Sequence, residues 1–322
     1  MRTIVVTIPV EDRHKAYLEQ IGKDCEFVYT SPKEVTEEQA ASADIIIGNV
    51  PPAKMHAPEK LQWMQLNSAG ADNYCKPGIL KDETVLTNAT GAYGLAISEY
   101  MLGQALNLQK KFYEYQENQK NHEWKDLGKV GSIYGSVTVI LGLGDIGGEF
   151  AKRMKAMGSY TIGVRRTAGE KPDYLDEIHT TDELDSLLPR ADFLAMSLPN
   201  TPQTFHIMTE ERLRMMKKTA FLINVGRGTA IDQEALIRVL KDGHLGGCAV
   251  DVVEGGEPMA AENPLWEAPR VLITPHVAGG YHVQETFERI VRISGENLEK
   301  FLAGDIEHMR SKVNRATGYR AR

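Results

Sequence analysis

The sequence predicts an α/β protein made of two doubly wound parallel-sheet domains. Its 322 residues, with 42% hydrophobic content, are enough to supply two separate cores. Short and nearly continuous Val/Ile runs recur along the chain, as in strands that are covered on both faces. Helical patterns lie between several of these runs, and an alternation of strands and helices is typical of parallel sheets.

The N-terminal part of the chain contains short apolar runs of strand length, each ending at Pro, Gly or Asn. These runs are residues 3–9, 43–49, 63–67 and 84–88. From Gly91 the period changes, and apolar residues at helical spacing predict one long helix over residues 92–119. We expect this helix to be a passage between the two domains.

The second part of the chain repeats the strand–helix alternation. Residues 136–141 form a buried-strand run, an amphipathic helix follows until Gly158, and residues 160–164 read as the next strand. Later strand-like runs are residues 192–199, 220–226, 246–253 and 270–275, with a helical pattern at 232–243 and a final helix at 283–304. Because no Pro/Ser-rich linker separates the domains, we expect their boundary to lie in the helices.

Charge and cysteine usage exclude several classes of protein. The net charge of −7 gives no dominant basic field for nucleic acid. Cys25, Cys75 and Cys248 lack CxxC spacing, which argues against a disulfide framework or a metal site and fits a reducing cytosol. No apolar run approaches the roughly 20 residues that span a bilayer. We therefore expect a cytoplasmic protein without a nucleic-acid partner, a membrane partner or a metal.

A GxGxxG pattern follows the buried strand at 136–141 and opens the next helix, at Gly142, Gly144 and Gly147. The first glycine permits a tight turn, the second lets the backbone approach a pyrophosphate, and the third lets helix and strand pack closely. The helix start at Asp145 and Ile146 would offer unpaired N–H groups to the phosphates. This context predicts a dinucleotide site, and the alternative is a close-packed turn without a ligand.

The end of the second strand carries arginines where an acid is common. Arg165 lies 23 residues after Gly142, and Arg166 and Thr167 follow it. A carboxylate at this place accepts hydrogen bonds from the ribose hydroxyls of NAD, whereas an arginine can pair with the 2′-phosphate of NADP. The charge favours NADP(H) as cofactor, with NAD(H) possible. The alternative is that both arginines are solvated loop charges.

Three further strand ends carry reactive side chains. Arg227 lies in a glycine-flanked turn, Asp251, Glu254 and Glu257 lie at or after the next strand, and His276 follows another strand and a proline. Ligands of open α/β sheets bind outside the carboxyl ends of the strands, so we expect these loops to converge near the glycine turn. There they could orient an anionic substrate and move a proton.

Several motifs, in this order, resemble those of the D-isomer-specific 2-hydroxyacid dehydrogenase family over nearly the full chain. They are "NSAGAD", "GLGDIG", "SLPNTPQT", "INVGRG", the "VDV…EP…NPLW" segment and "ITPHVAGG". The resemblance implies a Rossmann cofactor domain, residues 100–282, inserted into a flavodoxin-like substrate domain, residues 1–99 plus 283–322. It also implies a homodimer formed through the region around residues 99–135.

The resemblance assigns catalytic roles by matching position. Arg227 would hold the substrate carboxylate and keto oxygen, His276 would be the acid/base, and Glu257 would hydrogen-bond the imidazole. Backbone N–H groups of Ala69 and Gly70 would bind the substrate carboxylate. A hydride would pass between substrate C2 and nicotinamide C4 while His276 exchanges the hydroxyl proton.

One spacing departs from the family pattern. Glu257 lies six residues after Asp251, where five is usual. Either the loop has gained a glycine at Gly255–Gly256, or Glu254 takes the place of Glu257 as partner of the histidine. The interval from Glu257 to His276 matches the family, which favours Glu257.

Further cofactor contacts are implied by the resemblance alone. Ser197, Pro199 and Thr204 would form the loop beneath the adenosine and ribose. Asp251 is either a strand-end cap or a contact to the nicotinamide amide. The remaining positions implied to contact the cofactor are Val225, Gly226, His276 and Gly279.

The sequence therefore predicts an oxidoreductase that transfers a hydride between NADP(H) and a small 2-ketoacid or D-2-hydroxyacid. A glyoxylate/hydroxypyruvate-type reductase is the first expectation for the substrate, from the breadth of the family. The alternative is a nucleotide-sensing, corepressor-like interaction protein with weak or no turnover, because some relatives in this family act as corepressors.

Overall fold

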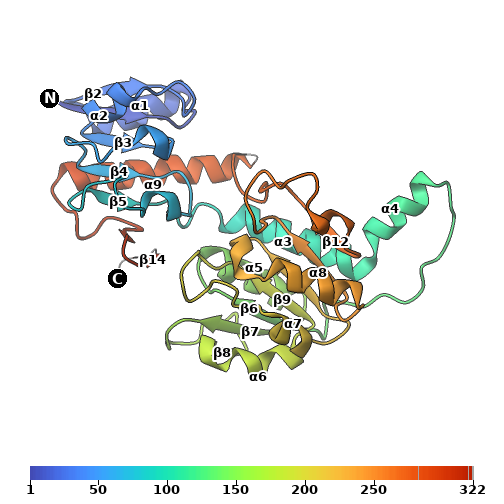
Figure 1. The fold of residues 1–322 in the computed structure, drawn as a ribbon. Coiled ribbons are helices and arrows are strands. Elements are labelled where there is room, and N and C mark those ends of the chain that lie inside the picture. The colour runs from blue at the N-terminus through green and yellow to red at the C-terminus, as the bar shows by residue number, and fades with distance from the viewer. Residues whose placement is uncertain (282, 318, 321–322) are drawn as a thin grey trace. The chain divides into compact units, whose positions relative to one another are not determined.

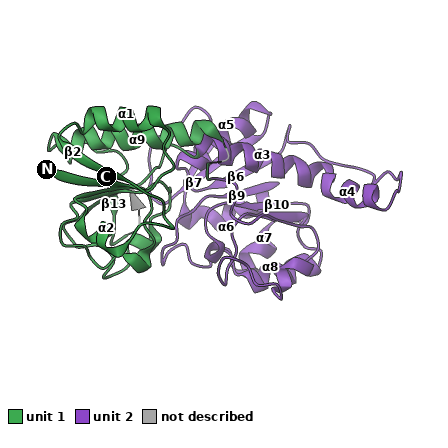
Figure 2. Ribbon diagram, turned by 90° about the horizontal axis from the view of Figure 1, so that it is seen from above, with its two compact units in different colours: residues 1–93, 280–322 green, residues 94–279 purple. Residues whose placement is uncertain are grey.

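The computed structural model describes residues 1–281, 283–317 and 319–320. The chain divides into two compact units (Figure 2): unit 1 is residues 1–93 with 280–322, and unit 2 is residues 94–279. The first break thus falls between Tyr93 and Gly94, at the start of the expected long helix, whereas the sequence analysis places it at residue 99.

Unit 1 contains a parallel sheet with the strand order β2-β1-β3-β4-β5. Its strands are β1 (Arg2–Val6), β2 (Cys25–Tyr29), β3 (Ile45–Ile47), β4 (Trp63–Gln65) and β5 (Val85–Thr87). Its α-helices are α1 (Asp12–Ile21), α2 (Glu37–Ser42) and α9 (Gln284–Leu302), and β13 (Val313–Asn314) pairs with β14 (Tyr319–Arg320). This strand order is that of a flavodoxin-like doubly wound fold.

The C-terminal helix α9 belongs to the N-terminal sheet because its buried face packs there. The fully buried indole of Trp63 stacks on Phe301 at 5.2 Å between ring centroids. The buried amide of Asn297 donates to Oε1 of Gln65 at 2.8 Å. Figure 2 shows α1 and α9 on one face of this sheet and α2 on the other. The two ends of the chain therefore share one core.

Unit 2 contains a longer parallel sheet with the order β12-β11-β10-β9-β6-β7-β8. Its strands are β6 (Val137–Leu141), β7 (Tyr160–Arg165), β8 (Glu177–Thr180), β9 (Phe193–Met196), β10 (Phe221–Asn224), β11 (Gly247–Val250) and β12 (Val271–Ile273). Its α-helices are α3 (Gly94–Lys110), α4 (Phe112–Lys120), α5 (Asp145–Ala156), α6 (Leu184–Leu187), α7 (Glu210–Met215) and α8 (Gln233–Lys241). The chain winds outward from β6 in both directions, so the strand order reverses between β6 and β9, as in a Rossmann fold.

Helices cover both faces of the unit 2 sheet. In Figure 2, α3 and α5 lie on one face, and α6, α7 and α8 lie on the other. The near-continuous apolar strands follow from this arrangement, because each is buried on both sides: β9 and β11 are buried along their whole length. The predicted fold class of two doubly wound parallel-sheet domains is confirmed.

The long helix expected at 92–119 is wrong in one respect, because the structure breaks it between α3 and α4 (Figure 1). Lys111 takes a left-handed conformation with φ 58°. The side-chain oxygen of Asn107 accepts the N–H of Tyr113 at 3.0 Å and so caps the new start. Helix α4 has no buried residue to hold it in line with α3.

Candidate active site

The turn after β6 is built from glycines for steric reasons. A Cβ on Gly147 would lie 1.9 Å from the carbonyl oxygen of Gly142, so no side chain fits there. Gly142 has φ +102°, a conformation that side chains disfavour, and a Cβ on it would meet the Ser197 carbonyl at 3.1 Å. These two glycines let β6 and α5 approach each other closely.

Gly144 is different, because a Cβ on it would have nothing within 4 Å. This exposed residue is the N-cap of α5, and no side chain of the described residues caps the helix there. The first-turn N–H groups, from Asp145 onward, therefore have no side-chain cap and carry a partial positive charge. Open space, uncapped donors and a missing side chain fit a dinucleotide pyrophosphate.

The carboxylate of Asp145 is engaged inside unit 2. Its Oδ2 accepts the N–H of Gly94 at 2.7 Å, and a Cβ on Gly94 would lie 2.5 Å from Oδ1. Asp145 thus joins the start of α3 to the start of α5. At this position only the backbone is left for a phosphate.

The end of β7 presents the two arginines beside the glycine turn, since β6 and β7 are neighbours. Arg165 is half-buried, and its guanidinium lies against Gly169, where a Cβ would be only 2.6 Å from Nη1. Arg166 is exposed. No carboxylate stands among residues 165–168.

The loops after β6, β9, β10 and β11 contact one another at the carboxyl edge of the sheet. Ser197 Oγ donates to the Gly142 carbonyl at 3.1 Å. A Cβ on Gly226 would lie 2.6 Å from the Leu198 nitrogen, and one on Gly228 would lie 2.0 Å from the Val253 carbonyl oxygen. Both glycines of "INVGRG" are thus needed because the backbone of a neighbouring loop lies too close for a side chain. The loop of Arg227 therefore packs directly on the loops after β9 and β11.

Asn224 is a site residue that the sequence analysis missed. Its fully buried amide accepts the Gly226 N–H at 3.0 Å and donates to the Arg227 carbonyl at 3.0 Å. It therefore sets the shape of the turn that presents Arg227. The signal was an Asn at the end of a strand before Gly, which favours a turn closed by the side chain.

Thr204 and Pro199 shape the loop after β9. The buried Thr204 hydroxyl donates to the Pro199 carbonyl at 2.7 Å and accepts the Thr201 N–H at 2.9 Å. This hydroxyl is engaged within its own loop, where it fixes the course of the backbone.

Asp251 organises the segment that carries His276. This buried carboxylate accepts hydrogen bonds from Thr274 Oγ1 at 2.5 Å, from the Val277 N–H at 2.9 Å and from the Ala278 N–H at 3.0 Å. Its own carbonyl accepts the His276 N–H at 2.9 Å. The sequence left two roles open for Asp251, a cap at the strand end or a contact to the nicotinamide amide. Both carboxylate oxygens are engaged in the cap.

His276 pairs with Glu257: its Nδ1 lies 2.6 Å from Oε2 of Glu257. The side chain of His276 is 52% exposed, so its other ring nitrogen can reach a ligand. Glu254 instead pairs with His206, at 2.6 Å from Nε2. Glu257, which the spacing favours, is thus the partner of His276, and Glu254 has a different histidine partner.

His276 and Glu257 line a cavity of about 360 Å³ within unit 2. Most of its other walls are apolar: they come from Val253, Pro258, Met259, Trp266, Ile273 and Pro275.

The expected substrate-binding turn of unit 1 is closed by side chains. Ser68 Oγ donates to the Gly70 carbonyl at 2.6 Å, and Asn88 Nδ2 donates to the Ala69 carbonyl at 2.7 Å. Among the hydrogen bonds of the described residues, the N–H groups of Ala69 and Gly70 donate to none. They remain able to bind an anion.

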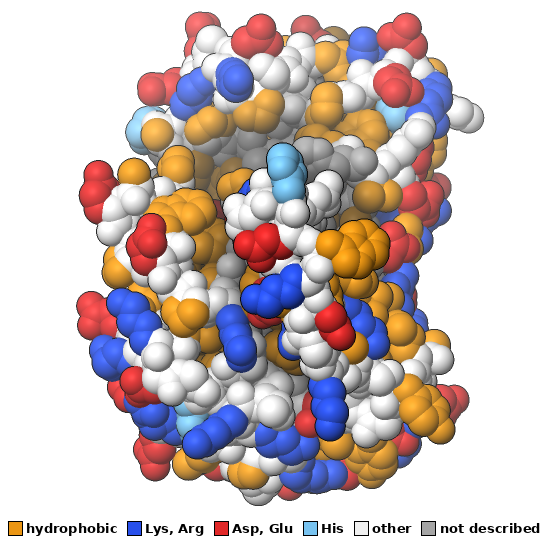
Figure 3. All heavy atoms as spheres, turned by 90° about the vertical axis from the view of Figure 1, so that its right-hand side faces the viewer, with side chains coloured by type: hydrophobic (Ala, Val, Ile, Leu, Met, Phe, Trp, Pro, Cys, Tyr) orange, Lys and Arg blue, Asp and Glu red, His pale blue; other side chains and the backbone are white. Residues whose placement is uncertain are grey.

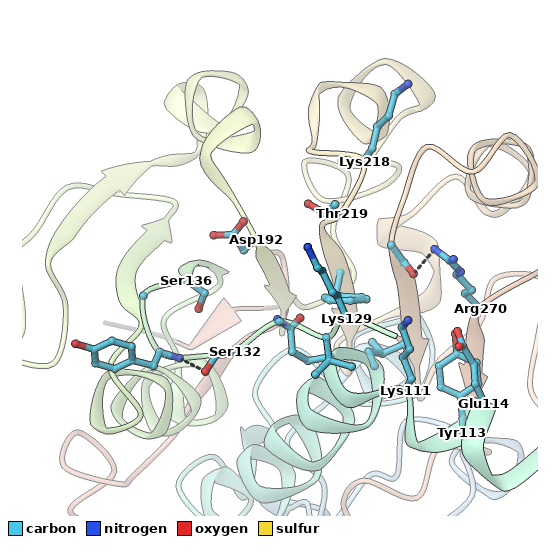
Figure 4. A pocket seen from close by; sticks show the side chains of 18 residues that line it. Lys111, Tyr113, Glu114, Lys129, Ser132, Ser136, Asp192, Lys218, Thr219 and Arg270 are labelled. Carbon is cyan, nitrogen blue, oxygen red and sulfur yellow. Dashed lines mark hydrogen bonds between the residues drawn. The ribbon is translucent and has the colours of Figure 1, made fainter. Parts of the chain in front are cut away.

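A second cavity, of about 460 Å³, opens at the amino edge of the unit 2 sheet, away from all expected site residues. Figure 4 shows the side chains that line it, with Lys129 and Asp192 among them. Figure 3 shows basic, acidic and apolar side chains interspersed over one face of the molecule. In the part of the chain that the structure describes, no group of His, Cys, Asp or Glu could hold a metal ion, and no helix is long and apolar enough to cross a membrane.

Comparison with known proteins places this geometry in a family. Residues 102–278 match the model of the D-isomer specific 2-hydroxyacid dehydrogenase NAD binding domain. The chain belongs to this family. It is an oxidoreductase that acts on CH–OH donors with NAD(P), and its 7-strand sheet is the NAD binding domain.

Named relatives cover much of the chain. A glyoxylate reductase of Korarchaeum cryptofilum is 31% identical over 78% of this chain and 76% of its own. A glyoxylate/hydroxypyruvate reductase B of Yersinia enterocolitica is 30% identical over 80% of each. A D-3-phosphoglycerate dehydrogenase of Methanocaldococcus jannaschii is 29% identical over 95% of this chain, which spans only 58% of that relative's length.

The fold is also that of a solved family member. The crystal structure of a D-isomer specific 2-hydroxyacid dehydrogenase family protein from Aeromonas salmonicida has a TM-score of 0.83 and 28% identity. The match covers 98% of this chain and 99% of that one.

Proposed function

We propose that the protein reduces small 2-ketoacids to D-2-hydroxyacids with NADPH, and that glyoxylate and hydroxypyruvate are its substrate class. The observation that carries the proposal is the 2.6 Å hydrogen bond between His276 and Glu257 at the carboxyl edge of the unit 2 sheet. The names of the relatives from Korarchaeum and Yersinia support the substrate class.

His276 is the proton donor in this proposal. Glu257 fixes one ring nitrogen, which leaves Nε2 to give a proton to the oxygen of the keto group during reduction and to take it back in the reverse direction. A bound nicotinamide supplies or accepts the hydride. Asp251, which accepts the backbone N–H groups of His276 and of the two residues after it, keeps the imidazole in place.

Two groups in this proposal can bind a substrate carboxylate: the side chain of Arg227 in unit 2, and backbone N–H groups in unit 1. The guanidinium of Arg227 can bind a carboxylate bidentately and stays charged at every working pH. In unit 1, the N–H groups of Ala69 and Gly70 donate no hydrogen bond among the described residues and are suited to binding a carboxylate.

The preference for NADPH over NADH rests on charge at the end of β7. Arg165 and Arg166 would pair with a 2′-phosphate, and no carboxylate in residues 165–168 would repel it. Replacing Arg165 by Asp should raise KM for NADPH while KM for NADH stays the same or falls. Equal use of both cofactors by the wild type would contradict the preference.

We also propose that the protein is a cytoplasmic homodimer. Figure 1 shows α4 and the segment after it extending away from the unit 2 sheet, and this arm exposes Phe112 (52%), Trp124 (106%) and Tyr134 (80%). Large exposed apolar side chains gathered on one segment are typical of an interaction surface. Sedimentation of the wild type and of W124A tests this: a monomeric wild type would exclude the dimer. The unpaired thiols of Cys25, Cys75 and Cys248 fit a reducing compartment.

Turnover decides between the enzyme and the nucleotide-sensing alternative. We expect the wild type to oxidise NADPH in the presence of glyoxylate or hydroxypyruvate, as followed by NADPH absorbance, and H276A to lose most of this rate. Tight NADPH binding without turnover on any 2-ketoacid of a size series would favour the sensor instead. An unchanged rate in H276A would remove His276 from its role.

A further inference from the structure

Helix α3 reaches the His276 segment through a chain of hydroxyl groups. The Tyr100 hydroxyl lies 2.5 Å from Thr274 Oγ1, which lies 2.5 Å from Oδ1 of Asp251. In the second of these hydrogen bonds the Thr274 hydroxyl donates to Asp251. Its oxygen is then the acceptor of the proton of Tyr100, so the direction of the chain is fixed: Tyr100 to Thr274 to Asp251.

The chain ends on the backbone that presents His276. Asp251 accepts the N–H groups of Val277 and Ala278, and its carbonyl accepts the N–H of His276. A shift of this carboxylate would therefore move the imidazole itself. His276 has φ +54°, a left-handed backbone conformation that is uncommon for residues other than glycine, and these hydrogen bonds help to hold it.

The other end of the chain is firmly held. Helix α3 buries Met101, Ala105 and Leu108, and packs on α5, β10 and β11. Its first residue, Gly94, donates to Asp145 at the start of α5. Tyr100 is largely buried, and burial raises the pKa of its hydroxyl, which keeps the hydroxyl protonated and able to donate.

We propose that Tyr100 is a positioning residue: it acts through Thr274 and Asp251 to hold His276 in its reactive orientation. This inference rests on the proposed function, since it assigns a cause to the placement of the acid/base. Among the hydrogen bonds of the described residues, Tyr100 is joined to Thr274, so the effect proposed for it passes through Thr274.

The test compares Y100F and T274V with T274S, which keeps the hydroxyl, and with Y113F. Tyr113 is the matched control, because it is a partly buried tyrosine of the same unit whose hydroxyl donates to Glu114 at 2.9 Å. We expect Y100F, which removes one hydrogen bond of the chain, to lower kcat about tenfold, and T274V, which removes both, to lower it at least as much. In each variant KM for NADPH should stay within about twofold. T274S and Y113F should keep the wild-type kcat. The double variant Y100F/T274V should lose no more than T274V alone, because both remove one chain.

A second readout does not depend on turnover. In Y100F the amides of Val277 and Ala278 should exchange with deuterium about tenfold faster than in the wild type or Y113F, since their acceptor is less firmly held. If Y100F matches Y113F in exchange, or if the losses of the two single variants multiply in the double variant, Tyr100 has no positioning role. A wild type without turnover would refute the proposed function alone, and the exchange rates would still decide the role of Tyr100.

Discussion

Two glycines of the same turn should respond to alanine in opposite ways. A Cβ on Gly147 would lie 1.9 Å from the Gly142 carbonyl oxygen, while one on Gly144 would meet nothing within 4 Å. Gly144 also has φ −80°, which alanine adopts without strain. G147A should therefore destabilise the free protein, and G144A should leave its stability unchanged.

The magnitudes follow from the geometry. Relieving the contact in G147A requires the strand or the helix to move, and such overpacking costs about 1–3 kcal/mol, or a fall in Tm of roughly 3–10 °C for a unit of this size. In G144A the methyl group would occupy the space left for the pyrophosphate. Losing even one hydrogen bond to a charged phosphate, worth about 1.5–3 kcal/mol, weakens binding by about tenfold or more.

The assays are thermal unfolding without ligand and titration of NADPH by fluorescence, on the wild type and both variants. The reasoning about the turn is refuted if G144A binds NADPH as tightly as the wild type. An unchanged Tm in G147A would show that β6 and α5 do not approach as closely as described.

The remaining predictions concern the carboxylates. E257Q should lower kcat by about tenfold or more, because the negative charge beside His276 is lost. E254Q should lower kcat less, because the partner of Glu254 is His206. Equal losses of kcat in the two variants, measured by steady-state kinetics, would contradict this pairing. Hydrogen bonds from Arg190 and His179 hold the pKa of Glu177 at about 2, below its ordinary value of 4.5. The ionised carboxylate therefore stabilises the fold fully above about pH 4.5, and this contribution is lost as the pH falls toward 2. E177Q should lower the free energy of unfolding by about 1 kcal/mol near neutral pH, after allowance for the partial exposure of the side chain. Between pH 4.5 and about 2, the urea concentration at the unfolding midpoint should depend less on pH in E177Q than in the wild type. An equal pH dependence in the two proteins would contradict this role of Glu177.

Much of the fold followed from the sequence because buried parallel strands are nearly continuous apolar runs. In the two parallel sheets, the strands that the sequence analysis missed are the edge strands β2 and β8, which carry Glu26 and Glu177 and are only partly buried. An edge strand is covered less and so needs fewer apolar residues. The break at Lys111 was also out of reach, because it depends on one local cap from Asn107.

The site divides in the same way. The tight packing at Gly147 could be predicted from the glycine spacing, and the structure shows it. The role of Arg165 toward the cofactor stays a prediction. For the partner of His276, the spacing favoured Glu257 but left Glu254 open, because one extra residue precedes Glu257 in the loop. The three-dimensional contacts separate the two glutamates. Tyr100 carries no local signal, since its role depends on a contact with a residue 174 positions away.

The central claim is that Arg227 and His276 act on one substrate. A crystal structure of the protein with NADP⁺ and a 2-hydroxyacid tests it most directly. We expect the guanidinium of Arg227 on the ligand carboxylate and Nε2 of His276 within about 3 Å of the 2-hydroxyl oxygen. A ligand held elsewhere, with Arg227 and His276 both out of contact with it, would contradict the account.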